Sequence, residues 1–187
     1  MKAIKFLSAI VLILALISCT KDNASEQIIP IPNGDFELWD SMPILDNWQT
    51  NSCPACLPPF ETYIVQKVTD AAHGQFAAMF IYNNVFKSYA NNKFPISIHP
   101  TQLTGYIKST IASGDTTLIH IDLYSGNKIV DTGNWYATSS TSNYKKIEIP
   151  ITQNTSTADS ASIRIVGGGK LNTVLYVDNL VLSKISK

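Results

Sequence analysis

Side chains that could hold a polar ligand alternate with apolar side chains along one segment of the chain. Between residues 118 and 124 every second residue is aliphatic, and the others include His120, Asp122 and Tyr124. A period of two is typical of a strand, in which successive side chains point to opposite faces of a sheet. We therefore expect an imidazole, a carboxylate and an aromatic ring on one face, where they can act on the same ligand.

Two other predicted strands, 101–110 and 161–166, extend this face. Residues 101 to 110 alternate in the same way, and consecutive strands joined by a short turn usually pair. Sugars are held by aromatic rings that stack on their CH faces and by planar polar groups that bond their hydroxyls. The pattern predicts a glycan-binding face, with an ordinary solvated face as the alternative; its residues are Tyr106, Tyr124, His120, Asp122 and Arg164.

A second candidate for glycan binding is the pair Trp135 and Tyr136. The pair lies between Gly133-Asn134 and a Ser/Thr-rich stretch, which predicts an exposed loop. Aromatic rings on exposed loops are well placed to bind a ligand at the rim of a sandwich. Alternatively, Trp135 folds back onto the edge of the core. Further aromatic residues, Tyr82, Phe86 and Tyr89, lie in or beside the aperiodic segment 83–100.

Patterns typical of hydrolytic enzymes do not occur in the sequence. There is no Gly-x-Ser-x-Gly motif, and the three histidines stand in no familiar catalytic arrangement. A glycosidase needs two carboxylates in one cleft, and 14 acidic residues will form some close pair by chance. We therefore predict a protein that is not an enzyme.

The elements that must position these residues are predicted strands. Asn33-Gly34 predicts a tight turn before an opening strand that runs to Trp39, and no window shows a helical period. Many short strands in one domain of about 150 residues predict an all-β fold, a two-sheet antiparallel jelly-roll β-sandwich. The other expected strands are 62–68, 75–82, 101–110, 117–124, 128–132, 144–149, 161–166 and 173–183.

The N-terminal residues have the pattern of a bacterial export signal. Two lysines precede an apolar run from 6 to 17 that is too short to span a bilayer. Leu16-Ile17-Ser18-Cys19 resembles the lipobox of bacterial lipoproteins, which implies cleavage after residue 18 and a lipid such as palmitate on Cys19. We expect a signal peptide (1–18), a tether (19–32) and one domain (33–187), anchored in the outer membrane on its surface or periplasmic side. A plain signal peptide is the alternative.

Charge and cysteine content narrow the function classes. After removal of the signal peptide the chain has 12 basic and 14 acidic residues, so nothing attracts nucleic acid. Cys53 and Cys56 then form an even pair in an oxidising compartment, which predicts a disulfide. A thioredoxin-like redox motif would need a helix that begins at Cys53, and the prolines at 58 and 59 oppose such a helix. A zinc site at the two cysteines would need two further ligands, which the sequence nearby does not supply.

Two distant segments carry a family resemblance. Asn33 to Trp39 and Tyr176 to Leu180 resemble the opening and closing strands of carbohydrate-binding-module jelly rolls, which belong to the galactose-binding-like β-sandwiches. Together with Leu103 to Lys108, they are similar to Bacteroidetes-type surface lipoproteins with a carbohydrate-related domain. The resemblance implies a polysaccharide or host glycan as partner; a structural or adhesion module that binds another envelope or host protein is the alternative.

The same resemblance implies a structural calcium ion. Its ligands would be Asp35, Glu37 and Asp178, with backbone carbonyls near His73-Gly74 completing the oxygens that Ca²⁺ requires. The alternative is that Asp178 accepts hydrogen bonds from neighbouring amides and that Glu37 is solvated.

Overall fold

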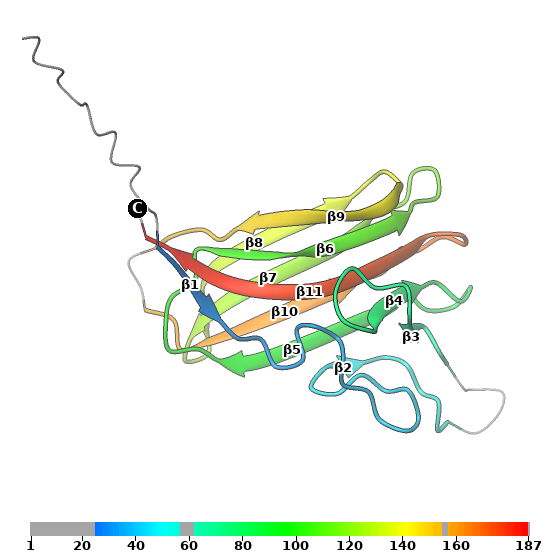
Figure 1. The fold of residues 1–187 in the computed structure, drawn as a ribbon, viewed down its shortest axis with the longest axis horizontal. Helices are drawn as coiled ribbons and strands as arrows, with labels where there is room; N and C mark the ends of the chain where they lie inside the picture. Colours follow the sequence, from blue (N-terminus) through cyan, green and yellow to red (C-terminus); the bar gives the residue numbers. More distant parts are fainter. Residues whose placement is uncertain (1–24, 57–61, 155–156, 187) are drawn as a thin grey trace, which may run out of the picture.

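The computed structural model describes residues 25–56, 62–154 and 157–186, and all regular elements in these ranges are strands (Figure 1). Cys19 and the predicted signal peptide lie outside them. In the described ranges, no helix is long and apolar enough to cross a membrane. The strands are β1 (Glu26–Ile29), β2 (Gln49–Thr50), β3 (Val65–Val68), β4 (Ala77–Ile81), β5 (Tyr89–Pro95), β6 (Gln102–Thr110), β7 (Thr117–Ser125), β8 (Lys128–Ala137), β9 (Thr141–Pro150), β10 (Ser160–Val166) and β11 (Val174–Ile185).

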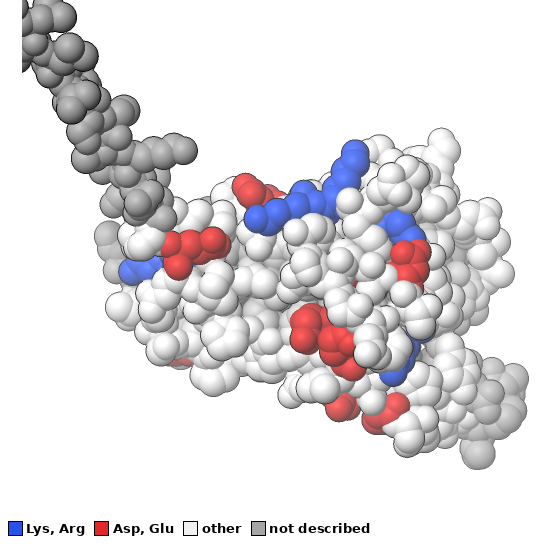
Figure 2. All heavy atoms as spheres, in the orientation of Figure 1, with Lys and Arg blue, Asp and Glu red and all other residues white. Residues whose placement is uncertain are grey.

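The strands form two antiparallel sheets packed face to face, which confirms the predicted all-β jelly-roll sandwich. The β11 sheet has the order β3-β4-β11-β6-β9, with β1 also paired to β11, and the β10 sheet has the order β2-β5-β10-β7-β8. On the side of the β11 sheet seen in Figure 2, acidic and basic side chains are intermingled.

The core lies between the sheets and follows from the period-two patterns. In β7 the aliphatic residues 119, 121 and 123 are fully buried, as are 161, 163 and 165 in the adjacent β10. Their neighbours in sequence point outward. The alternation in the sequence thus correctly separates the inner from the outer residues of both strands.

The predicted opening strand is wrong. Residues 31 to 36 form two overlapping turns, in which the Gly34 and Phe36 amides donate to the Ile31 and Asn33 carbonyls, and no strand continues to Trp39. The Asn33 side chain explains the difference because its amide group bonds the backbone of Leu38 and Asp46. These bonds fold the following segment back on itself instead of extending it.

The chain joins the sandwich earlier than expected. Glu26–Ile29, which we placed in the tether, forms β1 and pairs antiparallel with the end of β11. Ile29 and Ile31 are buried in the core cluster. Burial of these two side chains explains why a segment of otherwise polar composition is ordered.

The loop after the turn packs as a unit against the core. Trp48 is buried, its ring stacks on Phe36 at 5.3 Å between centroids, and its indole N–H donates to the Asn33 carbonyl at 3.0 Å. Farther along, Cys53 and Cys56 are joined by a disulfide.

Two strand predictions need correction. The strands β6 and β7 are consecutive but do not pair, because the turn between them crosses from the β11 sheet to the β10 sheet. The segment 83–100, which we left without regular structure, contains β5. Its inward positions include Asn92, whose amide donates to the Pro32 carbonyl, so a buried polar residue hides the alternation.

Candidate functional site

The outer face of the β10 sheet carries a row of polar side chains that crosses all five strands. Register places Gln49 opposite Asn91, Asn91 opposite Arg164, Arg164 opposite His120 and His120 opposite Asn134. We call these five residues the polar row. They offer amide and imidazole groups, which can both donate and accept hydrogen bonds, and a guanidinium group, which only donates.

A second row lies two residues along each strand and is apolar in its middle. Val166 and Leu118 lie opposite each other, with Tyr89 beyond Val166 and Tyr136 beyond Leu118. We call these four residues the apolar row. The tyrosines are 38% and 57% exposed, so the row ends in an accessible ring on each side.

The two rows meet at a hollow of about 480 Å³ on this face. Its lining comprises Gln49, Asn91 and Arg164 of the polar row, Tyr89 and Val166 of the apolar row, and Lys87 just before β5. The hollow is therefore bounded by a ring, amides and two cationic groups.

Hydrogen bonds order the other side of the polar row. The imidazole of His120 lies between Asn134 Oδ1, 2.7 Å from Nδ1, and Asp122 Oδ2, 2.9 Å from Nε2. Lys93 lies over the Tyr124 ring, 4.4 Å from its centroid. Burial, and then the charge of Asp122, raise the pKa of the Tyr124 hydroxyl against the opposing charge of Arg164. The phenol therefore stays protonated and able to donate.

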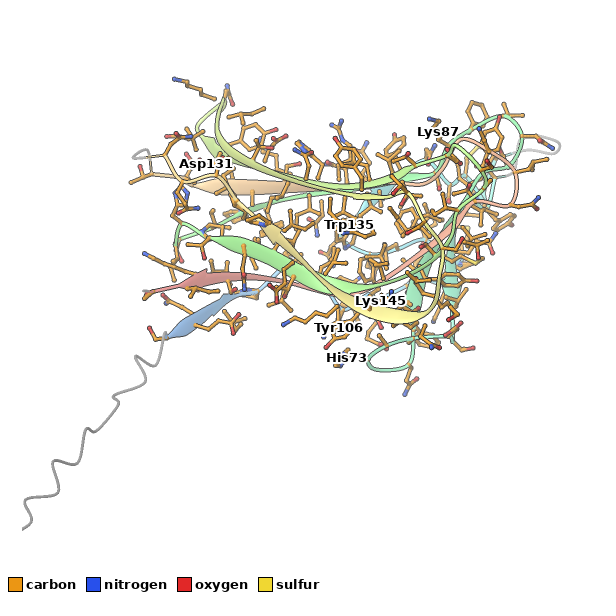
Figure 3. All side chains as sticks on the ribbon, turned by 90° about the horizontal axis from the view of Figure 1, so that it is seen from above. His73, Lys87, Tyr106, Asp131, Trp135 and Lys145 are labelled. Atoms are coloured by element: carbon orange, nitrogen blue, oxygen red, sulfur yellow. A yellow bond between two sulfur atoms is a disulfide. The ribbon has the colours of Figure 1, made fainter. Side chains whose placement is uncertain are left out.

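The structure gathers five of the seven predicted glycan-binding residues and separates two. Tyr124, His120, Asp122, Arg164 and Tyr136 share the outer face of the β10 sheet. Tyr106 lies on the outer face of the β11 sheet, where the centroid of its ring is 4.7 Å from that of His73. Trp135 lies between the two sheets (Figure 3).

The predictions for Tyr106 and Trp135 are wrong for different reasons. Tyr106 is displaced because β6 belongs to the β11 sheet. Trp135 is not on a loop because β8 continues to residue 137, and it lies opposite the buried Ile119, which directs its ring inward. Its neighbour Tyr136 must then point outward.

Four residues around the hollow were missed, or named only in passing, because they lie on β2 or near β5. These are Gln49, Lys87, Tyr89 and Asn91. A signal for β5 does exist, since Ala90 and Phe94 alternate with outward polar residues. The pairing of β2, only two residues long, depends on contacts from the rest of the sheet.

Two of the three proposed calcium ligands, Asp178 and Glu37, contact the same loop between β3 and β4 of the β11 sheet. Asp178 is buried, and its Oδ2 accepts from the amides of Ala72 and His73 at 2.7 and 2.8 Å. Glu37 Oε1 accepts from the amides of Gln75 and Phe76 at 2.8 and 3.0 Å. Glu37 is thus bonded to the backbone, whereas our alternative had it solvated.

One oxygen at this loop remains without a protein partner. Asp178 Oδ1 is buried and makes no hydrogen bond, and burial raises the pKa of this carboxyl against the amides of His73 and Ala72, which lower it. Asp35 is exposed. Within the described ranges, no three acidic, histidine or cysteine side chains gather closely enough to hold a metal, so calcium stays a prediction.

No family model and no curated protein matches the sequence. Among solved structures, the chain is similar to the TmCBM61 module in complex with β-1,4-galactotriose, with 14% identity, TM-score 0.54, and coverage of 80% of this chain and 90% of that one. The chain is also similar to a structure described as showing the basis of promiscuous specificity in carbohydrate-binding modules of the β-sandwich superfamily. The identity is 16%, the TM-score is 0.51, and the match covers 91% of this chain and 64% of that one.

An enzyme has a similar structure as well. The apo form of a cyclase from Fischerella sp. matches with 14% identity, TM-score 0.53, and coverage of 85% of this chain and 96% of that one. At such identities the likeness shows the fold. The chain therefore has a β-sandwich fold of the carbohydrate-binding-module type, which it shares with at least one enzyme.

Proposed function

We propose that this protein binds a glycan on the outer face of the β10 sheet and does not turn it over. The observation that carries the proposal is the parallel arrangement of the polar row and the apolar row across four neighbouring strands. At about 4.8 Å between strands, the rows extend about 14 Å from β5 to β8. A saccharide chain lying across the strands would meet rings and aliphatic groups on one side and hydrogen-bonding groups on the other.

The test is glycan-array and affinity-gel binding, with Tyr89→Ala and Tyr136→Ala as variants. Both rings are exposed, so the loss of either ring should reduce glycan binding about fivefold or more, as expected for a stacking contact worth about 1 kcal/mol or more, with the melting temperature unchanged. Tyr63→Ala, at an exposed tyrosine outside both rows, serves as the matched control. Full binding by both variants would refute the proposed site, and a folded protein that binds no glycan would refute the function.

The non-catalytic part of the proposal has its own test. A bound polysaccharide incubated with the protein should keep its chain length, as measured by size-exclusion chromatography. Shortened products that disappear in a variant of the binding face would instead indicate a glycosidase.

We also propose that a lipid on Cys19 anchors the protein in the outer membrane. The support is the Leu-Ile-Ser-Cys sequence at 16–19, followed by five residues before the described part of the chain begins. Metabolic labelling with palmitate should mark the wild-type protein and not Cys19→Ala. Unlabelled wild-type protein that fractionates as soluble would contradict the anchor.

An adhesion module is the second candidate, and one surface favours it. The Asn83 carboxamide accepts from the amides of Val85 and Phe86, and this turn between β4 and β5 leaves both side chains exposed, at 67% and 53%. An apolar pair at the rim of a sandwich could dock on a protein. Val85→Ser with Phe86→Ser should then abolish capture of an envelope protein and leave glycan binding intact.

A further inference from the structure

The charged side chains that line the hollow beside the polar row are all positive. Lys87 and Arg164 are its charged lining residues, and both side chains are exposed. Four ion pairs occur in the described part of the chain, and all involve other residues. The acidic residue nearest in register, Asp122, is already paired with His120 at 2.9 Å.

The position of Lys87 is built into the fold. Its carbonyl accepts from the Asn51 amide group at 2.8 Å, and the next residue, Ser88, accepts from the Gly167 amide at 2.8 Å. Its side chain passes directly over Gly169, where an added Cβ would lie 2.3 Å from Lys87 Cε. The absence of a side chain at residue 169 therefore leaves room for the lysine, which lines the hollow.

Arg164 approaches the same hollow from the middle of the sheet. Its strand, β10, is paired on both sides, so its backbone is fixed by β5 and β7. Guanidinium groups bind carboxylate and sulfate oxygens through a planar fork of donors, and a lysine adds a second positive charge. The amides of Asn91 and Gln49 beside them suit sugar hydroxyls, and Tyr89 suits a sugar face.

We infer that the hollow selects an anionic sugar, one with a carboxylate or sulfate group, within the glycan that binds this face. The inference rests on the proposed glycan-binding function and specifies its ligand class. Lys87 and Arg164 neutralise the anionic group, while the ring and the amides hold the rest of the sugar unit.

The test compares ligands that differ only in charge. Polygalacturonate should bind, and its fully methyl-esterified form should bind at least about tenfold more weakly, because a charge-assisted hydrogen bond contributes more than 1.4 kcal/mol. Binding of polygalacturonate should weaken as salt is raised from 50 to 500 mM. Dextran sulfate with dextran as its uncharged partner distinguishes a sulfate from a carboxylate ligand.

Matched variants locate the effect. Lys87→Gln and Arg164→Gln should each reduce polygalacturonate affinity about tenfold or more without lowering the melting temperature, since both side chains are exposed. Lys145→Gln, an exposed lysine on the other sheet (Figure 3), should change it less than twofold.

Four results would overturn the inference. Equal binding of the charged and esterified polymers, or binding of neutral glycans alone, would refute the anionic ligand and leave the proposed function standing. An equal loss in Lys145→Gln would show nonspecific attraction of a polyanion. A folded protein that binds neither charged nor neutral glycans would refute the proposed function itself.

Discussion

At the scale of single residues, Trp135 and Tyr136 show that neighbouring residues of one strand can have different roles, because their side chains point to opposite faces of the sheet. The sequence places it with Tyr136 on an exposed loop, whereas in β8 it points between the sheets and packs against the core. Trp135→Ala should lower the free energy of unfolding by about 3 kcal/mol, because it removes a large ring from a packed site. Tyr136→Ala should change it by less than about 0.5 kcal/mol.

Urea denaturation of both variants checks this prediction. The order would be reversed if Trp135 were the exposed binding residue that its sequence neighbours suggest. Glycan binding provides an independent readout, since Tyr136→Ala should weaken it and Trp135→Ala, when folded, should leave it unchanged.

Calcium binding is the other prediction at this scale. The buried Asp178 Oδ1 has no hydrogen-bond partner in the described structure, and a bound Ca²⁺ would compensate for this by coordinating the oxygen. Millimolar Ca²⁺ should therefore raise the melting temperature of the wild-type protein, and a chelator should reverse the rise.

Asp178→Asn is the matched variant for the calcium test, since it keeps the size of the side chain and removes its charge. Its melting temperature should not respond to Ca²⁺. Identical melting curves of the wild-type protein with calcium and with chelator would refute the site, and the hydrogen bonds of Asp178 to Ala72 and His73 would then be its whole role.

At the scale of elements, the turn between β6 and β7 is tied to the glycine turn between β10 and β11. Asp115 accepts from the amides of Gly169 and Lys170 at 3.0 and 2.9 Å, and Lys170 Nζ donates to the Ser113 carbonyl at 2.8 Å. Burial raises the pKa of Asp115, but the hydrogen bonds from Thr173 and from the backbone amides outweigh it, so the pKa is lowered.

This pKa shift gives a pH dependence with a definite sign. A carboxyl whose folded pKa is lowered contributes stability that is present above its unfolded pKa, near 3.8, and is lost as the pH falls through the folded value. Asp115→Asn should reduce stability at pH 7 by about 1 kcal/mol and weaken the acid dependence below pH 3.8. Thermal melts from pH 2 to 7 measure both, and an unchanged acid profile would contradict the assignment.

At the scale of the whole molecule, the N-terminal strand is part of the sandwich. Ile29 and Ile31 are 5% and 8% exposed, and β1 covers the last part of β11. A chain that begins at Asn33 loses both isoleucines and should be less stable by on the order of 3 to 6 kcal/mol.

A chain that begins at Ser25 retains β1 and should be as stable as a chain that begins at Cys19. Guanidinium unfolding of the two truncated forms makes the comparison. Equal stability would show that residues before 33 are the simple tether that their composition suggests.

The sequence by itself determined the fold class and most of the strands. Residues of β7 and β10 alternate so regularly that the inward and outward sets could be assigned without a structure. The pairing of Cys53 with Cys56 was also expected from the sequence, and the structure contains that disulfide. These properties are local, because a period of two is set by the geometry of one strand.

Only the tertiary structure decided which residues share a face. The same alternation is compatible with either sheet, and nothing in β6 or β7 alone states that the turn between them crosses the sandwich, which sends Tyr106 and Tyr124 to opposite sides of the molecule. Gln49, Lys87 and Tyr89 come together at one hollow because β2 pairs with β5. These strands are far apart in the sequence, so no local sequence pattern predicts their pairing. Strand order depends on long-range contacts, so the candidate site emerged only once both sheets were assembled.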